Sequence, residues 1–308
     1  MAELMSAALV LGAGQVGTFT ARRLVDDGAA VVAADAVPPC GFFARFGPPE
    51  VELAAVDVLD HEGVVALVRR TRADVVVLAA GIDAESCRRD PVTGWSVNAR
   101  GAEVVGDAAL VGGASRLVLV SSFAVYAPAL SGPIPETAPT APRTVYGRSK
   151  AAAETAVRRL GDQGLDVRIV RPCAVYGPGR PGFGSRSTRL VDRLLLAALG
   201  TGGACDIEDE EYMYVKDLAR ALSLVALDTH LPRQVTFNVG AGAVTDAHAL
   251  LQAVERLAQG QRIETRPPLG GARRFPLDVS RIRRRLAFQP QFDIAAGLKD
   301  YLETVAAS

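Results

Sequence analysis

Histidine and cysteine are scarce in this chain of 308 residues, and the few present are not spaced as metal ligands. The three histidines, His61, His230 and His248, lie far apart, and the four cysteines show no CxxC spacing. Structural and catalytic metal sites usually draw on closely spaced ligands of these types, so we expect no metal. Scattered thiols of this kind are typical of a reduced, cytoplasmic protein.

Net charge and long apolar runs are also absent. The 34 basic side chains balance the 34 acidic ones, so no overall field favours nucleic acid or an anionic membrane. No apolar run approaches the ~20 residues of a membrane span. Residues 1–10 carry no basic segment and lead straight into a glycine loop, which indicates a first β-strand and not a signal peptide.

The first motif present is that glycine loop. An apolar run at 7–11 precedes Gly12, Gly14 and Gly17 in GxGxxG spacing, and a helical pattern follows. This order is typical of dinucleotide binding, with the pyrophosphate at the helix N-terminus. The next apolar run ends in Asp35, whose carboxylate can accept hydrogen bonds from a ribose 2′-OH and would repel a 2′-phosphate. We therefore expect NAD and not NADP, although Asp35 could also be an ordinary turn residue.

Apolar runs and helical patterns alternate along the first 171 residues. Strands are expected at 51–56, 74–80, 116–120 and 165–171, with helices at 62–70, 95–110 and 146–160. This alternation predicts an α/β fold, a Rossmann-type doubly wound parallel sheet covered on both faces. Asp57 follows a strand at the carboxyl edge, where it could contact adenine or cap the helix near residue 60.

Tyr146 and Lys150 are four residues apart on an expected helix, so they share one face. A phenol titrates near pH ~10, and one that accepts a proton near neutrality needs its anion stabilised by roughly 3 pH units. A neighbouring ammonium, together with an oxidised nicotinamide ring, can supply that stabilisation. The spacing alone also fits a surface helix that carries both residues by chance.

With these motifs in order, the chain resembles an extended short-chain dehydrogenase/reductase of the NAD-dependent epimerase/dehydratase group. The matching pieces are the glycine loop, Asp35, VDV at 56–58, LAA at 78–80, VN at 97–98, SSFAVY at 121–126, Tyr146 with Lys150, RPCAVYGPG at 171–179, YVKDLA at 214–219, FNVG at 237–240 and DVSR at 278–281. The likeness covers nearly the whole chain.

The resemblance implies roles for single residues. Ser122 would hydrogen-bond the reacting oxygen, Tyr146 would be the general base or acid, and Lys150 would hold the nicotinamide ribose and lower the phenol pKa. The motifs and the resemblance together give these cofactor-binding residues: Gly12, Gly14, Gln15, Val16, Gly17, Asp35, Asp57, Val58, Ala79, Ala80, Asn98, Tyr146, Lys150 and Pro172.

The resemblance also implies an interleaved domain plan and a homodimer. Residues 1–176, with returning segments near 210–240, would form the NAD-binding Rossmann domain. Residues 177–209 and 241–308 would form a smaller, mostly helical substrate lobe. By analogy, the helices at 95–110 and 146–160 would pair with those of a second copy, although their small residues also suit packing on the sheet.

Several departures from the family pattern narrow the reaction. Phe123 and Ala124 stand where 4,6-dehydratases carry an acid pair, so we expect no dehydratase activity. Ala174 replaces an Asn and Glu210 replaces an Arg that help hold the nucleotide diphosphate. Glu210 belongs to an acidic run at 206–211 that would repel a pyrophosphate unless it is a solvated loop. Arginines that could offset it are Arg180, Arg186, Arg189, Arg266 and Arg273.

The candidate substrate residues are Ser122, Phe123, Ala174, Arg180, Arg189 and Glu210. The expected function is an NAD-dependent epimerase or oxidoreductase that moves hydride to and from a secondary alcohol carbon of a sugar or sugar-nucleotide-like substrate. One alternative is a net dehydrogenase or ketoreductase for a non-nucleotide hydroxy compound, such as a sugar acid or polyol. Another is a catalytically silent NAD-sensing binding protein.

Overall fold

Seven parallel strands form the central sheet of the computed structural model, which describes residues 6–127, 130–180, 184–201, 204–258, 262–266 and 275–307. Their order is β3-β2-β1-β4-β5-β6-β9. Their bounds are β1 Ala7–Leu11, β2 Ala30–Asp35, β3 Glu52–Ala55, β4 Val75–Leu78, β5 Arg116–Val120, β6 Asp166–Pro172 and β9 Val235–Val239. The order reverses between β1 and β4, and open α/β sheets bind ligands at the carboxyl ends of strands beside such a reversal.

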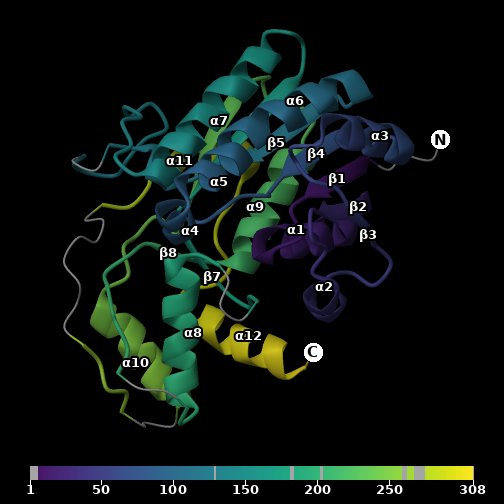
Figure 1. Ribbon diagram of the computed structural model, residues 1–308. Coiled ribbons are helices and arrows are strands. Elements are labelled where there is room, and N and C mark those ends of the chain that lie inside the picture. Colours follow the sequence, from purple (N-terminus) through teal and green to yellow (C-terminus); the bar gives the residue numbers. More distant parts are fainter. Residues whose placement is uncertain are drawn as a thin grey trace.

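Helices cover both faces of this sheet, as the apolar strand pattern predicts (Figure 1). Ala8 and Val10 of β1 enter one apolar core, and Leu9 and Leu11 enter the other. The first core includes residues of α1 (Gln15–Asp26), α2 (Cys40–Phe46) and α9 (Val215–Leu227). The second includes residues of α3 (His61–Thr71), α6 (Gly101–Gly112) and α7 (Val145–Gly161). The predicted Rossmann-type fold is therefore confirmed.

A second group of elements packs beside the carboxyl edge. Strands β7 (Ala174–Tyr176) and β8 (Tyr212–Tyr214) form a short parallel ladder. Helices α8 (Arg186–Ala198), α10 (Ala247–Leu257) and α12 (Ile294–Ala306) lie below it in Figure 1, while α11 (Ser280–Leu286) contacts β9. Among the described residues, no helix combines the length and apolar character that crossing a membrane would require.

The helix expected at 95–110 is present, but one of its turns is π-helical. Short helices α4 (Ala84–Arg89) and α5 (Pro91–Trp95) come first, and one π-helical turn over Ser96–Arg100 then joins α5 to α6. A π turn holds one residue more than a regular helical turn and often marks a functional site. Here it carries Asn98.

Candidate active site

The glycine loop lies between β1 and α1, at the reversal of strand order. Gly12 has φ +98°, and a side chain there would overlap the backbone of Ala80, so both the angle and the space require glycine. A Cβ on Gly17 would overlap the Gly12 carbonyl. The absence of a side chain at Gly17 therefore allows α1 to approach the loop closely. Gly14 faces open space, with no atom within 4 Å of its would-be Cβ, and α1 begins there without a side-chain cap. The first N–H groups of α1 are thus available to an anion.

Asp35 ends β2 and lies against this loop. Its Oδ2 accepts a hydrogen bond from the Ala13 N–H at 2.9 Å, and its Oδ1 accepts one from the Val37 N–H at 3.1 Å. The carboxylate therefore holds the backbone of the loop through the Ala13 N–H. Asp57 instead makes a tight turn, where its Oδ1 accepts from the Leu59 N–H at 2.9 Å. The alternative of Asp57 as the α3 cap was wrong, because Asp60 caps that helix through the Gly63 N–H.

Other predicted cofactor residues lie at or after the carboxyl ends of strands β3, β4 and β6, or in the first turn of α1. The Ala79 and Ala80 N–H groups each donate to the Leu11 carbonyl at 2.8 Å. The Val58 side chain packs against Gly101, and Pro172 ends β6 beside Val239. Val16 follows Gln15 in the first turn of α1. The Gln15 side chain, however, reaches away from the loop and donates to the Gly177 carbonyl at 2.6 Å.

Ser122 and Tyr146 meet where β5 ends. Ser122 follows β5 and caps a 3-10 turn over Phe123–Val125, its Oγ accepting from the Ala124 N–H at 3.1 Å. Tyr146 is in the first turn of α7, which Thr144 caps through the Gly147 N–H at 3.0 Å. The Ser122 hydroxyl lies close enough to the Tyr146 hydroxyl to favour the phenolate. The sequence-predicted pair is therefore brought together at the carboxyl edge of the sheet.

Burial governs the ionisation of Tyr146 and Lys150. It raises the pKa of Tyr146 to about 12, and the nearby Ser122 hydroxyl only partly opposes this. It lowers the pKa of Lys150 to about 8, because the side chain is only 5% exposed. Lys150 Nζ donates to the Val120 carbonyl at 3.0 Å. In the protein without cofactor, desolvation thus outweighs the effects that lower the phenol pKa. The predicted lowering by Lys150 stays a prediction.

Asn98 connects α7, which carries Tyr146 and Lys150, to the segment that follows strand β4. Its Oδ1 accepts from the Ile82 N–H at 2.8 Å, and its Nδ2 donates to the Ile82 carbonyl at 3.0 Å and to Ser149 Oγ at 3.2 Å. The side chain is buried, and Cys87 Sγ also lies 3.4 Å from Nδ2. Asn98 therefore fixes the segment after β4 against α7, next to Lys150.

A buried charged network behind the serines was missed by the sequence analysis. Glu154 of α7 pairs with Arg171 of β6 at 2.6 Å and accepts a hydrogen bond from Ser121 Oγ at 2.6 Å. Arg171 also donates to the Tyr126 hydroxyl at 2.9 Å, which in turn donates to Asn238 Oδ1 at 2.6 Å. The available signal was Glu154, a charge one turn after Lys150 on the inward face of the helix.

The predicted substrate residues do not form one open patch. Arg189 pairs with Glu85 of α4 at 2.6 Å, and Glu210 forms a β-bridge with Thr245. Ala174 is buried in β7, whereas Phe123 is partly buried in the turn beside Ser122. Arg180 also has an interaction partner. These residues therefore differ in burial and in the partners that hold them.

The acidic run at 206–211 is not the solvated loop considered as an alternative. Glu211 is fully buried, and its carboxylate accepts from the Gly242 N–H at 2.8 Å and the Leu277 N–H at 2.9 Å. The other four carboxylates also have partners, which are Arg266 for Asp206, Arg186 for Glu208, the Ala247 N–H for Asp209 and the Glu211 N–H for Glu210. Arg273 lies outside the described residues.

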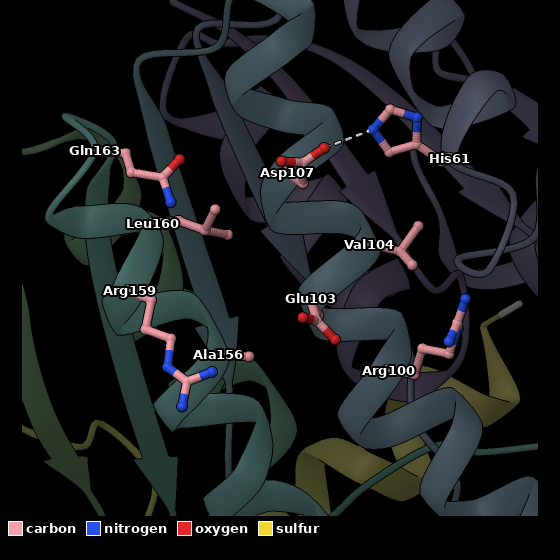
Figure 2. A pocket seen from close by; sticks show the side chains of 9 residues that line it. All are labelled: His61, Arg100, Glu103, Val104, Asp107, Ala156, Arg159, Leu160 and Gln163. Atoms are coloured by element: carbon pink, nitrogen blue, oxygen red, sulfur yellow. Dashed lines mark hydrogen bonds and ion pairs between the residues drawn. The ribbon is translucent and has the colours of Figure 1, made fainter.

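A groove of about 440 Å³ lies between the outer faces of α6 and α7 (Figure 2). It is lined by His61, Arg100, Glu103, Val104, Asp107, Ala156, Arg159, Leu160 and Gln163. At its edge His61 Nε2 lies 2.8 Å from Asp107 Oδ2. Its α7 residues begin ten positions after Tyr146, roughly 15 Å along the helix, so the groove is separate from the serine–tyrosine pair.

The glycine loop at the strand reversal, with Ser122 and Tyr146 at the same edge of the sheet, is the arrangement of an α/β protein of the short-chain dehydrogenase/reductase type. The chain belongs to the NAD dependent epimerase/dehydratase family, whose model matches residues 8–240.

Relatives and solved structures agree with this membership. The UDP-glucose 4-epimerase of Mycolicibacterium smegmatis is 30% identical over 310 residues, which cover 96% of this chain and 97% of that protein. The dTDP-glucose 4,6-dehydratase of Streptomyces griseus is 30% identical over 314 residues, covering 94% and 91%. A UDP-glucose-4-epimerase structure from Stenotrophomonas maltophila, with bound NAD and formylated UDP-arabinopyranose, has a TM-score of 0.88 at 24% identity and covers 99% of this chain and 98% of that one. Both epimerases and dehydratases thus occur among the relatives.

Proposed function

We propose that the protein is an NAD-dependent epimerase or oxidoreductase acting on a secondary alcohol carbon of a sugar or sugar-nucleotide-like substrate. The observation that carries this proposal is the closeness of the Ser122 and Tyr146 hydroxyls, with Lys150 one helical turn further on. The glycine loop and this pair follow strands β1 and β5 at the same edge of the sheet. A proton-transfer group and a dinucleotide site can therefore serve one substrate.

The residues at the loop fit NAD. Open space at Gly14 and the uncapped start of α1 suit a pyrophosphate, and the Asp35 carboxylate suits an unphosphorylated ribose. Lys150 and the segment held by Asn98 would border the nicotinamide ribose. When bound, NAD supplies the carbon that takes up and returns the substrate's hydride, and its oxidised form adds a positive charge.

The chain's own residues would move the proton. Ser122 would hold the substrate oxygen, while Tyr146 would take the hydroxyl proton and later return it. The pKa of Tyr146, raised to about 12 by burial, is too high for a base at neutral pH. The positive charges of Lys150 and of oxidised NAD would need to stabilise the phenolate by several pH units. Proton abstraction is thus expected only with the oxidised cofactor present.

The family's two reactions can be distinguished by the residues after Ser122. A 4,6-dehydratase needs an acid and a base to eliminate water, and Phe123 and Ala124 supply neither. The nearby carboxylate of Glu154 is held by Arg171 and Ser121. These observations favour epimerisation or simple oxidation over dehydration.

A second substrate class is favoured by residues 174 and 210. Ala174 offers no amide for a diphosphate, and the carboxylate of Glu210 accepts from the Glu211 N–H at 2.9 Å. A non-nucleotide sugar acid or polyol would then be oxidised with release of NADH. Cofactor retention separates the two cases, because an epimerase that reuses its cofactor should purify with one NAD per chain, whereas a dehydrogenase should purify without it.

We also propose the domain plan, the location and the assembly expected from the sequence. Residues 177–209 and 241–308 would form the substrate lobe, and four free thiols suit a cytoplasmic protein. The groove between α6 and α7 carries both Arg100 and Arg159 and the acids Glu103 and Asp107. Such mixed charges can pair with those of a second copy across a two-fold axis, which supports a homodimer.

The decisive experiment replaces Tyr146 with Phe. Turnover of UDP-glucose, dTDP-glucose, free sugar acids and polyols is measured with NAD, following both NADH absorbance and product stereochemistry. The variant should lose at least about 10²-fold in turnover, a typical share for general acid–base catalysis, while NAD binding by calorimetry is unchanged. Tyr176→Phe, which removes a buried hydroxyl that makes no hydrogen bond with the described residues, is the matched control. Unchanged turnover in Tyr146→Phe would refute the mechanism.

A further inference from the structure

Gln15 joins the glycine loop to a segment more than 160 residues away in the sequence. Its Nε2 donates to the Gly177 carbonyl at 2.6 Å and lies 3.2 Å from the Pro178 carbonyl. Its Oε1 accepts from Thr188 Oγ1 at 3.3 Å. Both ends of the side-chain amide are thus used, and all three partners belong to the region that follows β7.

The partners of Gln15 form one connected unit. Thr188 is fully buried in the first turn of α8, and its Oγ1 also lies 3.1 Å from the Val175 carbonyl of β7. Ser185, the cap of α8, donates to the same carbonyl at 3.3 Å. A Cβ on Gly177 would overlap the Val215 side chain, so this backbone is closely packed as well. A displacement of the Gln15 side chain would therefore also shift the residues at the end of β7 and at the start of α8.

The backbone N–H of Gln15 lies at the start of α1, where it can bind a ligand. Gln15 is the first residue of α1. It directly follows Gly14, the cap position, which has no side chain to accept a hydrogen bond from the helix. The Gln15 N–H is therefore one of the helix-start donors that have no partner within the helix. Anions bind to such donors. One residue therefore presents its N–H to the expected pyrophosphate site and its side chain to the region that starts α8.

We propose that Gln15 is a positioning residue that couples dinucleotide binding at the glycine loop to the placement of Gly177, Pro178 and the start of α8. The proposal rests on the proposed function, since it requires NAD at the loop. Cofactor bound there would restrict the motion of the loop backbone. The hydrogen bonds of the Gln15 side-chain amide would in turn restrict the motion of Gly177, Pro178 and the start of α8. By linkage, substrate held by the α8 region would tighten cofactor binding by the same factor.

Hydrogen exchange of the full-length chain, with and without NAD, tests this coupling. In the parent protein, NAD should slow exchange in peptides 9–20, at the glycine loop, and in peptides 174–180 and 184–190 by about fivefold or more, the low end of usual coupling. Gln15→Met keeps the length of the side chain and removes its amide. In this variant peptide 9–20 should still respond to NAD, while the response of the other two peptides should fall below about twofold.

Two further variants complete the design. Gln252→Met makes the same change on the exposed face of α10 and should behave as the parent. Thr188→Val removes one of the Gln15 contacts and should give an intermediate response, which provides a second test if Gln15→Met folds poorly. Full NAD-dependent protection of 174–180 and 184–190 in Gln15→Met would overturn the coupling alone. If NAD does not slow exchange in peptide 9–20 of the parent protein, both the cofactor assignment and the coupling are overturned.

Discussion

Glu154 on α7 and Arg171 on β6 form a buried ion pair with two hydrogen bonds, of 2.8 and 2.6 Å, and side chains no more than 5% exposed. Ser121, the residue before Ser122, donates to the same carboxylate. The ion pair thus joins α7, the helix that carries Tyr146, to β6. The Ser121 bond joins the same carboxylate to the segment after β5, which carries Ser122.

Breaking this pair should cost far more than breaking a similar pair on the surface. Glu154→Gln keeps the shape but leaves the Arg171 charge buried without an anion, which should lower the free energy of unfolding by about 3–5 kcal/mol. Glu52 and Arg70 form an equally short pair, at 2.6 Å, that is about half exposed. Glu52→Gln should cost less than about 1 kcal/mol. Urea denaturation of both variants measures the difference, and equal costs would contradict the role given to burial.

Lys150 should lower the stability of the cofactor-free protein at neutral pH. Its pKa falls from 10.5 to about 8 because burial disfavours the ammonium, a shift that corresponds to roughly 3 kcal/mol. Lys150→Met relieves this cost but leaves the Val120 carbonyl without its donor, at about 1 kcal/mol. We expect a net gain of about 2 kcal/mol at pH 7, together with loss of turnover.

The sign of the pH dependence checks this interpretation. Below pH 8 the folded and unfolded chains both carry the Lys150 proton, so the whole cost is present. As the pH rises from about 8 toward 10.5, the folded chain releases the proton and the unfolded chain keeps it, so the parent gains stability. Denaturation between pH 7 and 10 should show the advantage of Lys150→Met shrinking. An advantage that grows with pH would rule out burial as the cause.

Asp35 should control the choice between NAD and NADP. Asp35→Asn removes the negative charge that would repel a 2′-phosphate while keeping an oxygen for the Ala13 N–H. The ratio of NADP to NAD dissociation constants should fall about tenfold or more, equivalent to at least ~1.4 kcal/mol. Calorimetric titration with both cofactors measures it. Asp26→Asn, on the exposed end of α1, is the control, and an unchanged ratio in Asp35→Asn would contradict the assignment.

The groove between α6 and α7 should be closed by a second copy of the chain. Ala156→Arg places a large cation in the groove beside Arg159 and Arg100, and it should convert a dimer into a monomer. Ala249→Arg makes the same change on the exposed face of α10 and should leave the dimer intact. Sedimentation velocity of the three proteins provides the measurement. A parent that sediments as a monomer would refute the assembly.

Local sequence patterns predicted the parts of the molecule whose causes are local. The run from residue 7 through the glycine loop to Asp35 forms the strand, turn, helix and strand expected, because apolar periodicity and glycine act within a few residues. The helical spacing of Tyr146 and Lys150 held for the same reason.

Properties that depend on distant neighbours were not predictable. The Gln15 contact joins positions 162 residues apart, and nothing near either end signals it. The phenol pKa of Tyr146 depends on how much protein covers it, which spacing does not encode. The carboxylates of the run at 206–211 are held by chain segments between residues 186 and 277, so their charge pattern alone left a solvated loop open as an alternative.

The π turn over Ser96–Arg100 makes the length of this segment as important as its composition. Deleting one residue there would restore regular helical winding and rotate everything on one side of the turn by about 100° relative to the other. The Asn98 side-chain amide would then lose its hydrogen bonds with the Ile82 N–H and Ser149 Oγ. This loss would occur even though each remaining residue is compatible with a helix. Natural variants of this segment should therefore tolerate substitutions far more readily than insertions or deletions.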